Sequence, residues 1–353
     1  MSIRTIISGL LLMVAAITAG PSSADTLALN PDAPQRYVVV KGDTLWDISA
    51  RFLRDPWLWP EIWYVNPEIS NPHLIYPGDI VLLTYDKDGK PVLKVQRGGT
   101  SNDIKLSPEV RATPLHSAIP TIPLDSIRQF LNRPRVVTKE EFDKAPYIVA
   151  FQDRHLIAAE ANKAYVRGAE ALSVGKAYGI YRLGDAYRNP GSKEGDILGY
   201  ETTQVADGRI DKLGDPASLL LTHSYRETLL GDRLFEMDTH EFDQNFMPHA
   251  PANPVSGKII AVVDGVSRIG QYQVVVLNLG TNQGMEAGHV LSIHQAGETI
   301  VDPIRPKKRN EQVTLPDEYA GLLMVFRAFE KVSYALIMEA ERDIKIFDSV
   351  TQP

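Results

Sequence analysis

Apolar and polar positions in residues 37–83 follow first a strand period and then a helix period. Residues 37–40 are aromatic and β-branched, which predicts a strand. Thr44 precedes apolar positions spaced by three and four, with Asp47 at the place of a capping acid, so a helix is predicted next. A second helix is expected over residues 59–63, and residues 80–83 predict a closing strand. This stretch is therefore expected to form a small βααβ module.

The sequence motifs of the module resemble those of the LysM domain family. It carries "GDTL" after the first strand, "EIWYVNP" at the second helix and "PGD" before the last strand, in the family's order. It departs from the family's short form by the insertion "LRDPWLWP" between the helices. The resemblance covers residues 36–84 and implies binding of N-acetylglucosamine-containing glycans, chiefly peptidoglycan, between two loops. Carried over by position, the glycan-binding residues are Gly42, Asp43, Thr44, Leu45, Asn71, Pro72, His73, Leu74 and Ile75.

The chemistry of these loops fits a neutral sugar. Gly42 permits close backbone approach, and Leu74 and Ile75 are expected to supply an apolar floor for N-acetyl groups. His73 is equally interpretable as a sugar contact or as a solvated loop residue.

All four tryptophans of the chain lie in this short module. A module of fewer than about 50 residues builds only a small core, which large aromatic side chains can enlarge. We therefore expect Trp46, Trp59 and Trp63 in the core. Trp57, in the insertion, is the least constrained, and stacking on a sugar is its alternative role.

The remaining pattern predicts an α+β multidomain chain with mainly β units at the C-terminal end. A polar linker is expected over residues 85–118, with a hairpin turn at Asp88-Gly89, and a mixed α/β segment over 119–160. Short apolar runs separated by glycine turns then predict two barrel-like β units, over 161–248 and 255–353.

The two β units share a rhythm of glycines and acids. The matching positions are Gly168 with Gly280, Gly175 with Gly288, Gly199 with Gly321, and Asp232 with Asp348. Divergent duplication is the preferred interpretation. The alternative, which the sequence leaves open, is that glycines and acids recur in this way in turns of unrelated β structures.

The first residues have the organisation of a secretory signal peptide. Arg4 precedes an apolar run that is broken at Gly20-Pro21, and small residues lead to a cleavage position after Ala24. A retained membrane anchor is the alternative, but the run is short for a bilayer of about 30 Å. We expect residues 1–24 to be removed and the protein to be periplasmic and associated with the cell wall.

Composition narrows the chemistry further. The chain has no cysteine, which excludes disulfides, thiolate nucleophiles and cysteine-bound zinc. Its formal net charge of −7 disfavours binding to nucleic acid or to anionic lipid. At most a peripheral association with the outer membrane is expected.

Catalytic motifs are not found in the sequence. His240-Glu241 lacks a second histidine at helical spacing for a zinc signature, and no Gly-x-Ser-x-Gly elbow or phosphate-binding glycine loop occurs. Paired carboxylates of a glycosidase cannot be judged from spacing. We expect a protein that is not an enzyme, with no cofactor and no metal.

Beyond the LysM stretch, the order of segments resembles the type IV pilus secretin-associated protein family (TsaP). The shared wording includes "IKLSPEVRATPLHSAIPTIPLDSIRQFLNRPRVV", "APYIVAF" and "YVRG". Residues 255–353 are similar to the C-terminal domain of the flagellar basal-body protein FlgT. The resemblance implies a non-catalytic protein that binds peptidoglycan and an outer-membrane secretin. A cell-wall hydrolase and a flagellar or other envelope accessory protein are the alternatives.

Overall fold

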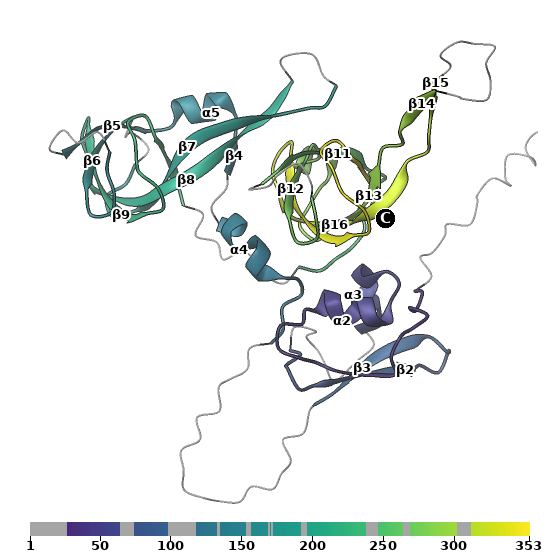
Figure 1. Cartoon of the computed structure of the whole chain (residues 1–353). Helices are drawn as coiled ribbons and strands as arrows, with labels where there is room; N and C mark the ends of the chain where they lie inside the picture. Colours follow the sequence, from purple (N-terminus) through teal and green to yellow (C-terminus); the bar gives the residue numbers. More distant parts are fainter. Residues whose placement is uncertain are drawn as a thin grey trace, which may run out of the picture.

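Short helices near the N-terminal end and many strands toward the C-terminal end make an α+β multidomain protein, which confirms the predicted class (Figure 1). The computed structural model describes residues 27–63, 74–97, 118–132, 135–152, 157–168, 170, 172–191, 196–237, 246–263, 269–301 and 312–353. The predicted signal segment 1–24 lies outside these ranges. Among the described residues, no helix combines the length and the apolar character needed to cross a membrane.

The N-terminal module has the predicted strand–helix–helix–strand order and one strand more. Its elements are β1 (Arg36–Val38), α2 (Leu45–Phe52), the 3-10 helix η1 (Pro56–Leu58), α3 (Trp59–Trp63), β2 (Ile80–Tyr85) and β3 (Pro91–Gln96). The three strands form an antiparallel sheet in the order β1-β2-β3. The predicted turn at Asp88-Gly89 is confirmed, because Asp86 and Lys90 close it between β2 and β3. The module therefore extends into residues that were expected to belong to a linker.

A first barrel follows after helix α4 (Leu124–Asn132) and the capped helix α5 (Lys139–Lys144). Its strands are β4 (Arg135–Val137), β5 (Tyr147–Phe151), β6 (Lys163–Arg167), β7 (Ala177–Arg188), β8 (Ile197–Lys212), β9 (Ala217–Ser224) and β10 (Arg233–Glu236). Strands β5 to β10 close a ring in the order β8-β7-β10-β5-β6-β9, since β9 also pairs with β8, and β4 lies along β8 outside that ring. The mixed segment was expected to end and the first β unit to begin at residue 160. The barrel instead includes β5, because β5 pairs with both β6 and β10.

A second closed barrel fills the C-terminal part. Its strands are β11 (Ser256–Val262), β12 (Val274–Leu277), β13 (Val290–Gln295), β16 (Glu318–Ala328), β17 (Ser333–Ala340) and β18 (Ser349–Thr351), in the order β11-β12-β17-β16-β13-β18. A 3-10 turn, η4 (Thr281–Gln283), separates β12 from β13. Strands β14 (Thr299–Val301) and β15 (Gln312–Thr314) form a separate hairpin that projects from the barrel as an arm (Figure 1).

The two barrels have the same topology. If the six ring strands of each are numbered along the chain, both rings read 1-2-5-4-3-6, and the β14–β15 arm is an insertion between the third and fourth. Each last strand is preceded by the same turn: the Asp232 carboxylate accepts from the Leu229 amide (2.7 Å), and the Asp348 carboxylate accepts from the Lys345 amide (2.8 Å). The acids matched in the sequence are therefore equivalent in space.

Equivalence extends to residues that the sequence comparison did not match. Ala161 and Tyr272 each precede the second ring strand with a left-handed backbone, at φ 66° and 65°. Their amides donate to the carbonyl oxygens of Leu221 and Ile337, each on the fifth ring strand of its barrel (2.9 and 2.8 Å). Non-glycine residues with positive φ are uncommon, so their recurrence at one position favours duplication over chance β punctuation.

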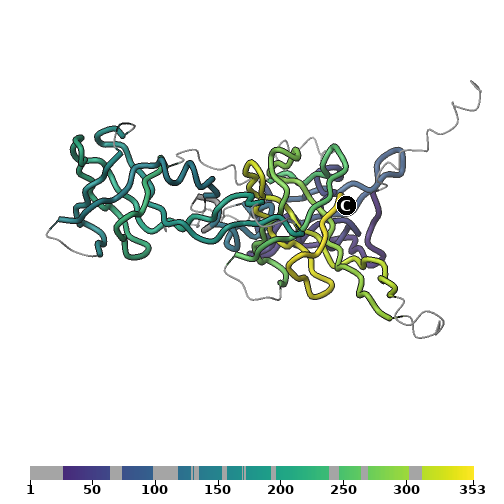
Figure 2. The backbone as a smooth tube through the Cα atoms, turned by 90° about the horizontal axis from the view of Figure 1, so that it is seen from above, coloured from purple at the N-terminus to yellow at the C-terminus, as the bar shows by residue number. Residues whose placement is uncertain are grey.

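The barrels differ in their outer faces. Strands β6 and β9 of the first barrel alternate buried positions with more exposed ones. In the second barrel, β12, β13, β16 and β17 are buried on consecutive positions. Their inward side chains form one core, whereas their outward side chains join a second cluster with helices α2, α3 and α4. The second barrel therefore has an apolar outer wall, which the N-terminal module covers (Figures 1 and 2).

The four tryptophans belong to this shared cluster. Trp46, Trp57, Trp59 and Trp63 are all buried, which agrees with the expected core role of three of them. Trp57 is also buried, with 7% of its surface exposed, and it lines a small pocket together with Leu58 and the barrel residues Tyr319 and Leu322. The insertion between the helices thus contributes to the contact with the second barrel.

Contacts between the barrels are made by the ends of β7 and β8, which extend from the first barrel toward the second (Figure 1). The hydroxyls of Tyr187 and Tyr334 lie 3.2 Å apart in a buried position, and the Asn278 amide donates to Asn189 (2.8 Å). Burial raises the pKa of both tyrosine hydroxyls. The pair therefore stays protonated and hydrogen-bonded at ordinary pH.

Replacing Trp59, which is fully buried, should destabilise the N-terminal module. Trp59→Ala is expected to cost about 3–5 kcal/mol, since it removes a large buried aromatic. Because every tryptophan lies in this module, tryptophan fluorescence during urea unfolding reports on it directly. Tyr85→Ala, at a side chain 62% exposed, is the control and should change the free energy by less than about 0.5 kcal/mol. An unchanged midpoint for Trp59→Ala would contradict the core assignment.

Candidate glycan-binding site

The loop between β1 and α2 is a tight turn fixed by Asp43. Its carboxylate accepts hydrogen bonds from the Val40 amide and the Tyr37 hydroxyl, both at 2.9 Å. Gly42 has φ +102°, and an added Cβ there would meet no atom within 4 Å. Gly42 is therefore the exposed corner of the loop, while Asp43 holds the turn from inside.

Thr44 and Asp47 cap helix α2 reciprocally. The Thr44 hydroxyl accepts from the Asp47 amide (3.1 Å), and the Asp47 carboxylate accepts from the Thr44 amide (3.3 Å). A helix begins with amides that have no partner inside the helix. The cap satisfies one of them and leaves the amides of Leu45 and Trp46 directed out of the helix end.

Those two amides are engaged by a distant part of the chain. The Leu45 amide donates to the Pro120 carbonyl oxygen (3.0 Å), and the Trp46 amide donates to the Thr121 carbonyl oxygen (3.1 Å). On the opposite side, the Ile119 amide donates to the Ile75 carbonyl oxygen (2.9 Å). Residues 119–121 therefore lie between the two loops to which the sequence assigns glycan binding, and we call the space between these loops the groove.

The loop leading to β2 is braced by charged residues. Arg97 donates to the Leu74 carbonyl oxygen (2.7 Å) and forms an ion pair with Asp79 at 2.6 Å. Asp79 also accepts from the Tyr76 amide (3.1 Å). Arg97 follows β3, beyond the stretch that the sequence pattern assigned to the module, so that pattern did not identify it.

The nine predicted glycan-binding residues divide into three groups. Gly42 and Leu74 are exposed, Leu74 to 44%. Four are buried and serve the module's own turn, cap or core: Asp43, Thr44, Leu45 and Ile75. Three lie outside the described residues: Asn71, Pro72 and His73. The buried side chain of Ile75 does not form the floor that was expected, although its backbone carbonyl borders the groove.

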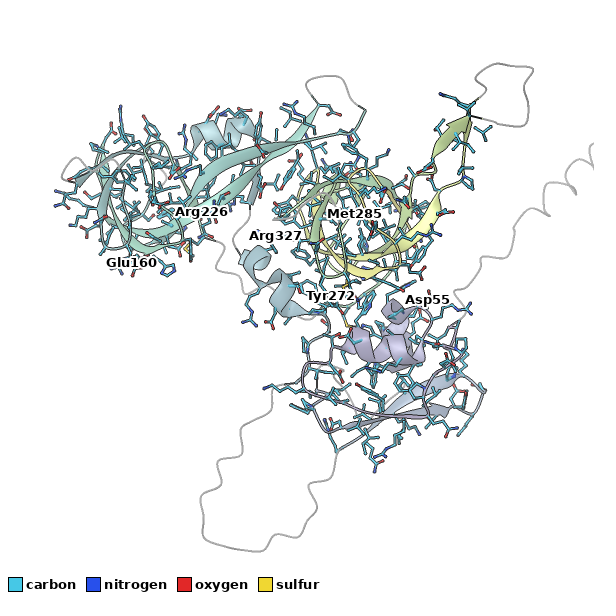
Figure 3. The ribbon with its side chains drawn as sticks, viewed as in Figure 1. Asp55, Glu160, Arg226, Tyr272, Met285 and Arg327 are labelled. Atoms are coloured by element: carbon cyan, nitrogen blue, oxygen red, sulfur yellow. The ribbon has the colours of Figure 1, made fainter. Side chains whose placement is uncertain are left out.

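Asp47 connects the cap of α2 to the second barrel. Its other oxygen accepts from the Tyr272 hydroxyl at 3.0 Å, across the contact between module and barrel (Figure 3). Burial, together with the neighbouring Asp47 carboxylate, raises the pKa of Tyr272 to about 12. One carboxylate thus orders the helix end and holds the module against the barrel.

His249, Glu286 and His289 form a cluster of possible metal ligands at the second barrel. Their ligand atoms lie within 4.8 Å of one another. The His289 Nδ1 accepts from the Glu286 amide (3.3 Å), which places the proton of the neutral ring on Nε2, toward the carboxylate. The His249 Nδ1 lies 2.9 Å from the Met247 carbonyl oxygen and its Nε2 lies 3.0 Å from Glu286. Hydrogen bonds within the cluster thus account for its geometry.

Comparison with known proteins identifies the N-terminal module. The LysM domain model matches residues 37–84. The uncharacterized protein YqbP of Bacillus subtilis (strain 168) is similar, with 43% identity over 59 residues, covering 14% of this chain and 27% of that protein. The match therefore spans about a quarter of the relative's length.

Residues 37–84 are a LysM domain, and LysM domains bind the N-acetylglucosamine glycans of peptidoglycan. The chain is therefore a multidomain protein in which a LysM domain precedes two β-barrels.

Removing the Tyr272 hydroxyl should weaken the contact between module and barrel. Tyr272→Phe is expected to lower the stability of the tryptophan-containing module by about 0.5–1.5 kcal/mol near neutral pH. The folded-state pKa is raised from 10 to about 12, so this contribution is complete below pH 10 and is lost as the pH rises toward 12.

The measurement is the urea midpoint of tryptophan fluorescence for wild type and variant between pH 7 and 12. Tyr85→Phe, at an exposed tyrosine, is the control and should follow the wild type throughout. A wild-type advantage that persists undiminished at pH 12 would contradict the assignment.

Proposed function

We propose that this protein is a non-catalytic peptidoglycan-binding protein of the bacterial periplasm, exported by a signal peptide that is cleaved after Ala24. The observation that carries the proposal is the LysM match over residues 37–84. The site beside it has the chemistry that an N-acetylated sugar requires. Two helix-end amides, those of Leu45 and Trp46, donate here to the carbonyl oxygens of Pro120 and Thr121, the kind of acceptor that an N-acetyl group also carries. Leu74 is exposed on the second loop.

The site fits a neutral glycan better than an anion. Gly42 bears no side chain at the corner of the first loop, so a sugar ring can approach the backbone there. The side chain of Asp43 is directed inward to the Val40 amide and does not present a charge at the surface. Binding would then depend on short-range hydrogen bonds and apolar contact.

The finer proposal is that the protein anchors the outer-membrane secretin of a type IV pilus to the cell wall. Support comes from the resemblance of the segment order to the TsaP family and from the architecture. Two barrels with the topology 1-2-5-4-3-6 stand beyond the glycan module, and an exposed arm of β14 and β15 projects from one of them. Such surfaces suit protein partners, because exposed strand edges accept further strands.

Peptidoglycan binding is tested by co-sedimentation of the full chain with purified sacculi. Gly42→Trp should reduce the bound fraction several-fold, because a bulky side chain would occupy the corner where the sugar approaches. Gly89→Trp is a matched control. Gly89 also has a positive φ, and an added Cβ there would meet no atom within 4 Å, but it lies in the β2–β3 turn. Equal loss in both variants, or in neither, would contradict the site.

Two further readouts accompany this experiment. Added salt should leave binding nearly unchanged, since screening acts mainly on exposed charges. Zymography on the same sacculi should show no clearing. Clearing would favour the alternative of a cell-wall hydrolase.

The secretin proposal is tested by affinity capture of the tagged full chain from detergent-solubilised envelopes. We expect the secretin to be recovered with wild type and equally with Gly42→Trp, because that change leaves the barrels untouched. Loss of the gene should leave the secretin present but loosely anchored, with fewer surface pili. Recovery of flagellar basal-body components without secretin would replace this assignment, and recovery of neither would reduce the function to wall binding.

A further inference from the structure

The glycan groove of this LysM domain contains a segment of the protein's own chain. Residues 119–121 are held on both sides, by the amides of Leu45 and Trp46 and by the carbonyl of Ile75. The side chains of Ile119 and Ile122 are buried, with 6% and 0% exposure. The segment is therefore fixed by three backbone hydrogen bonds and two apolar anchors.

The segment presents the same chemical group as an N-acetylated sugar. The carbonyl oxygens of Pro120 and Thr121 are amide oxygens, as is the oxygen of an N-acetyl group. One amide N–H makes one strong hydrogen bond, so a sugar cannot use the Leu45 and Trp46 amides while the segment holds them. Occupation by the segment and by a glycan at this point exclude each other.

The bound segment also has one unfavourable feature, which makes it easier to displace. The Thr121 side chain is 1% exposed, and its hydroxyl has no hydrogen-bond partner among the described residues. A buried hydroxyl without a partner disfavours the state that buries it. The free energy that holds the segment in place is lowered accordingly.

We propose that residues 119–122 are an internal ligand of the LysM groove, and that N-acetylglucosamine glycan binds by displacing them. This inference rests on the proposed glycan-binding function. The apparent affinity for glycan is then the affinity of the open groove multiplied by the fraction of molecules in which the segment has left the groove.

Displacement would be transmitted to the barrels. The segment leads at Pro123 directly into α4, whose Ile127 is fully buried in the cluster shared with the second barrel. Arg327 of that barrel donates to the Phe130 carbonyl oxygen of α4 (3.4 Å). Glycan binding therefore changes the restraint on α4, and by reciprocity a partner that stabilises α4 in its place weakens glycan binding.

Two variants of the full chain shift the equilibrium in opposite directions. Ile119→Asp should release the segment, because it places a charge at a buried anchor. Thr121→Val should hold it more firmly, because it replaces the unpaired hydroxyl with a methyl group of the same size. Ile119→Ala is a milder releasing variant in case the aspartate disturbs folding, and Ile157→Asp, at a side chain 52% exposed, is the control.

The first measurement is amide hydrogen exchange without sugar. Release predicts faster exchange at Leu45 and Trp46 in Ile119→Asp and Ile119→Ala, and slower exchange in Thr121→Val, with Ile157→Asp unchanged. Wild type with saturating hexamer of N-acetylglucosamine should show faster exchange over residues 118–123. Unchanged exchange there, with the sugar bound, overturns the proposal.

The second measurement is the affinity for the same hexamer by calorimetry. Ile119→Asp should bind about tenfold more tightly than wild type, and Thr121→Val more weakly. Equal affinities across the series overturn the internal ligand while leaving glycan binding intact. Absence of binding in every protein, including those with exposed Leu45 and Trp46 amides, overturns the glycan-binding function and the competition with it.

Discussion

The apolar outer wall of the second barrel is the constraint on which the rest of this structure depends. A closed antiparallel barrel needs only its inward positions to be apolar, yet β12, β16 and β17 are apolar on both faces. Exposure of that wall to water would be costly, so another element must cover it. The helices of the LysM module and α4 do so, and all four tryptophans of one short stretch belong to the cluster that they form with the wall.

Covering the wall also determines how the glycan site is held. Asp47 completes the cap of α2 and accepts a hydrogen bond from Tyr272 of the barrel, so the helix end that carries the Leu45 and Trp46 amides is held against the barrel. The chain that leads from the module toward the barrels passes through the groove on its way to α4. The proposed binding surface, the domain contact and the connecting segment therefore meet at one helix end.

The two barrels show how one topology serves two packing roles. Both close their rings in the same order and end on equivalent aspartate turns, at Asp232 and Asp348. The first barrel keeps polar outward positions and joins the second mainly through the ends of β7 and β8. The second has exchanged outward polarity for contact with the module. A shared ring with different outer faces favours divergence after duplication, the interpretation preferred from the sequence.

The sequence by itself determined the local features: the capped helix at Thr44, the glycine turns, the LysM pattern and the repeated positions of the β units. These depend on neighbours within a few residues, which periodicity and capping rules describe. It did not show that β5 belongs to the first barrel, that Trp57 and Tyr319 line one pocket, that Arg97 braces Leu74, or that residues 119–121 bond to Leu45, Trp46 and Ile75. Each of these joins segments distant along the chain, and only the tertiary structure decides them, because apolar burial is not directional and many pairings would satisfy the same pattern.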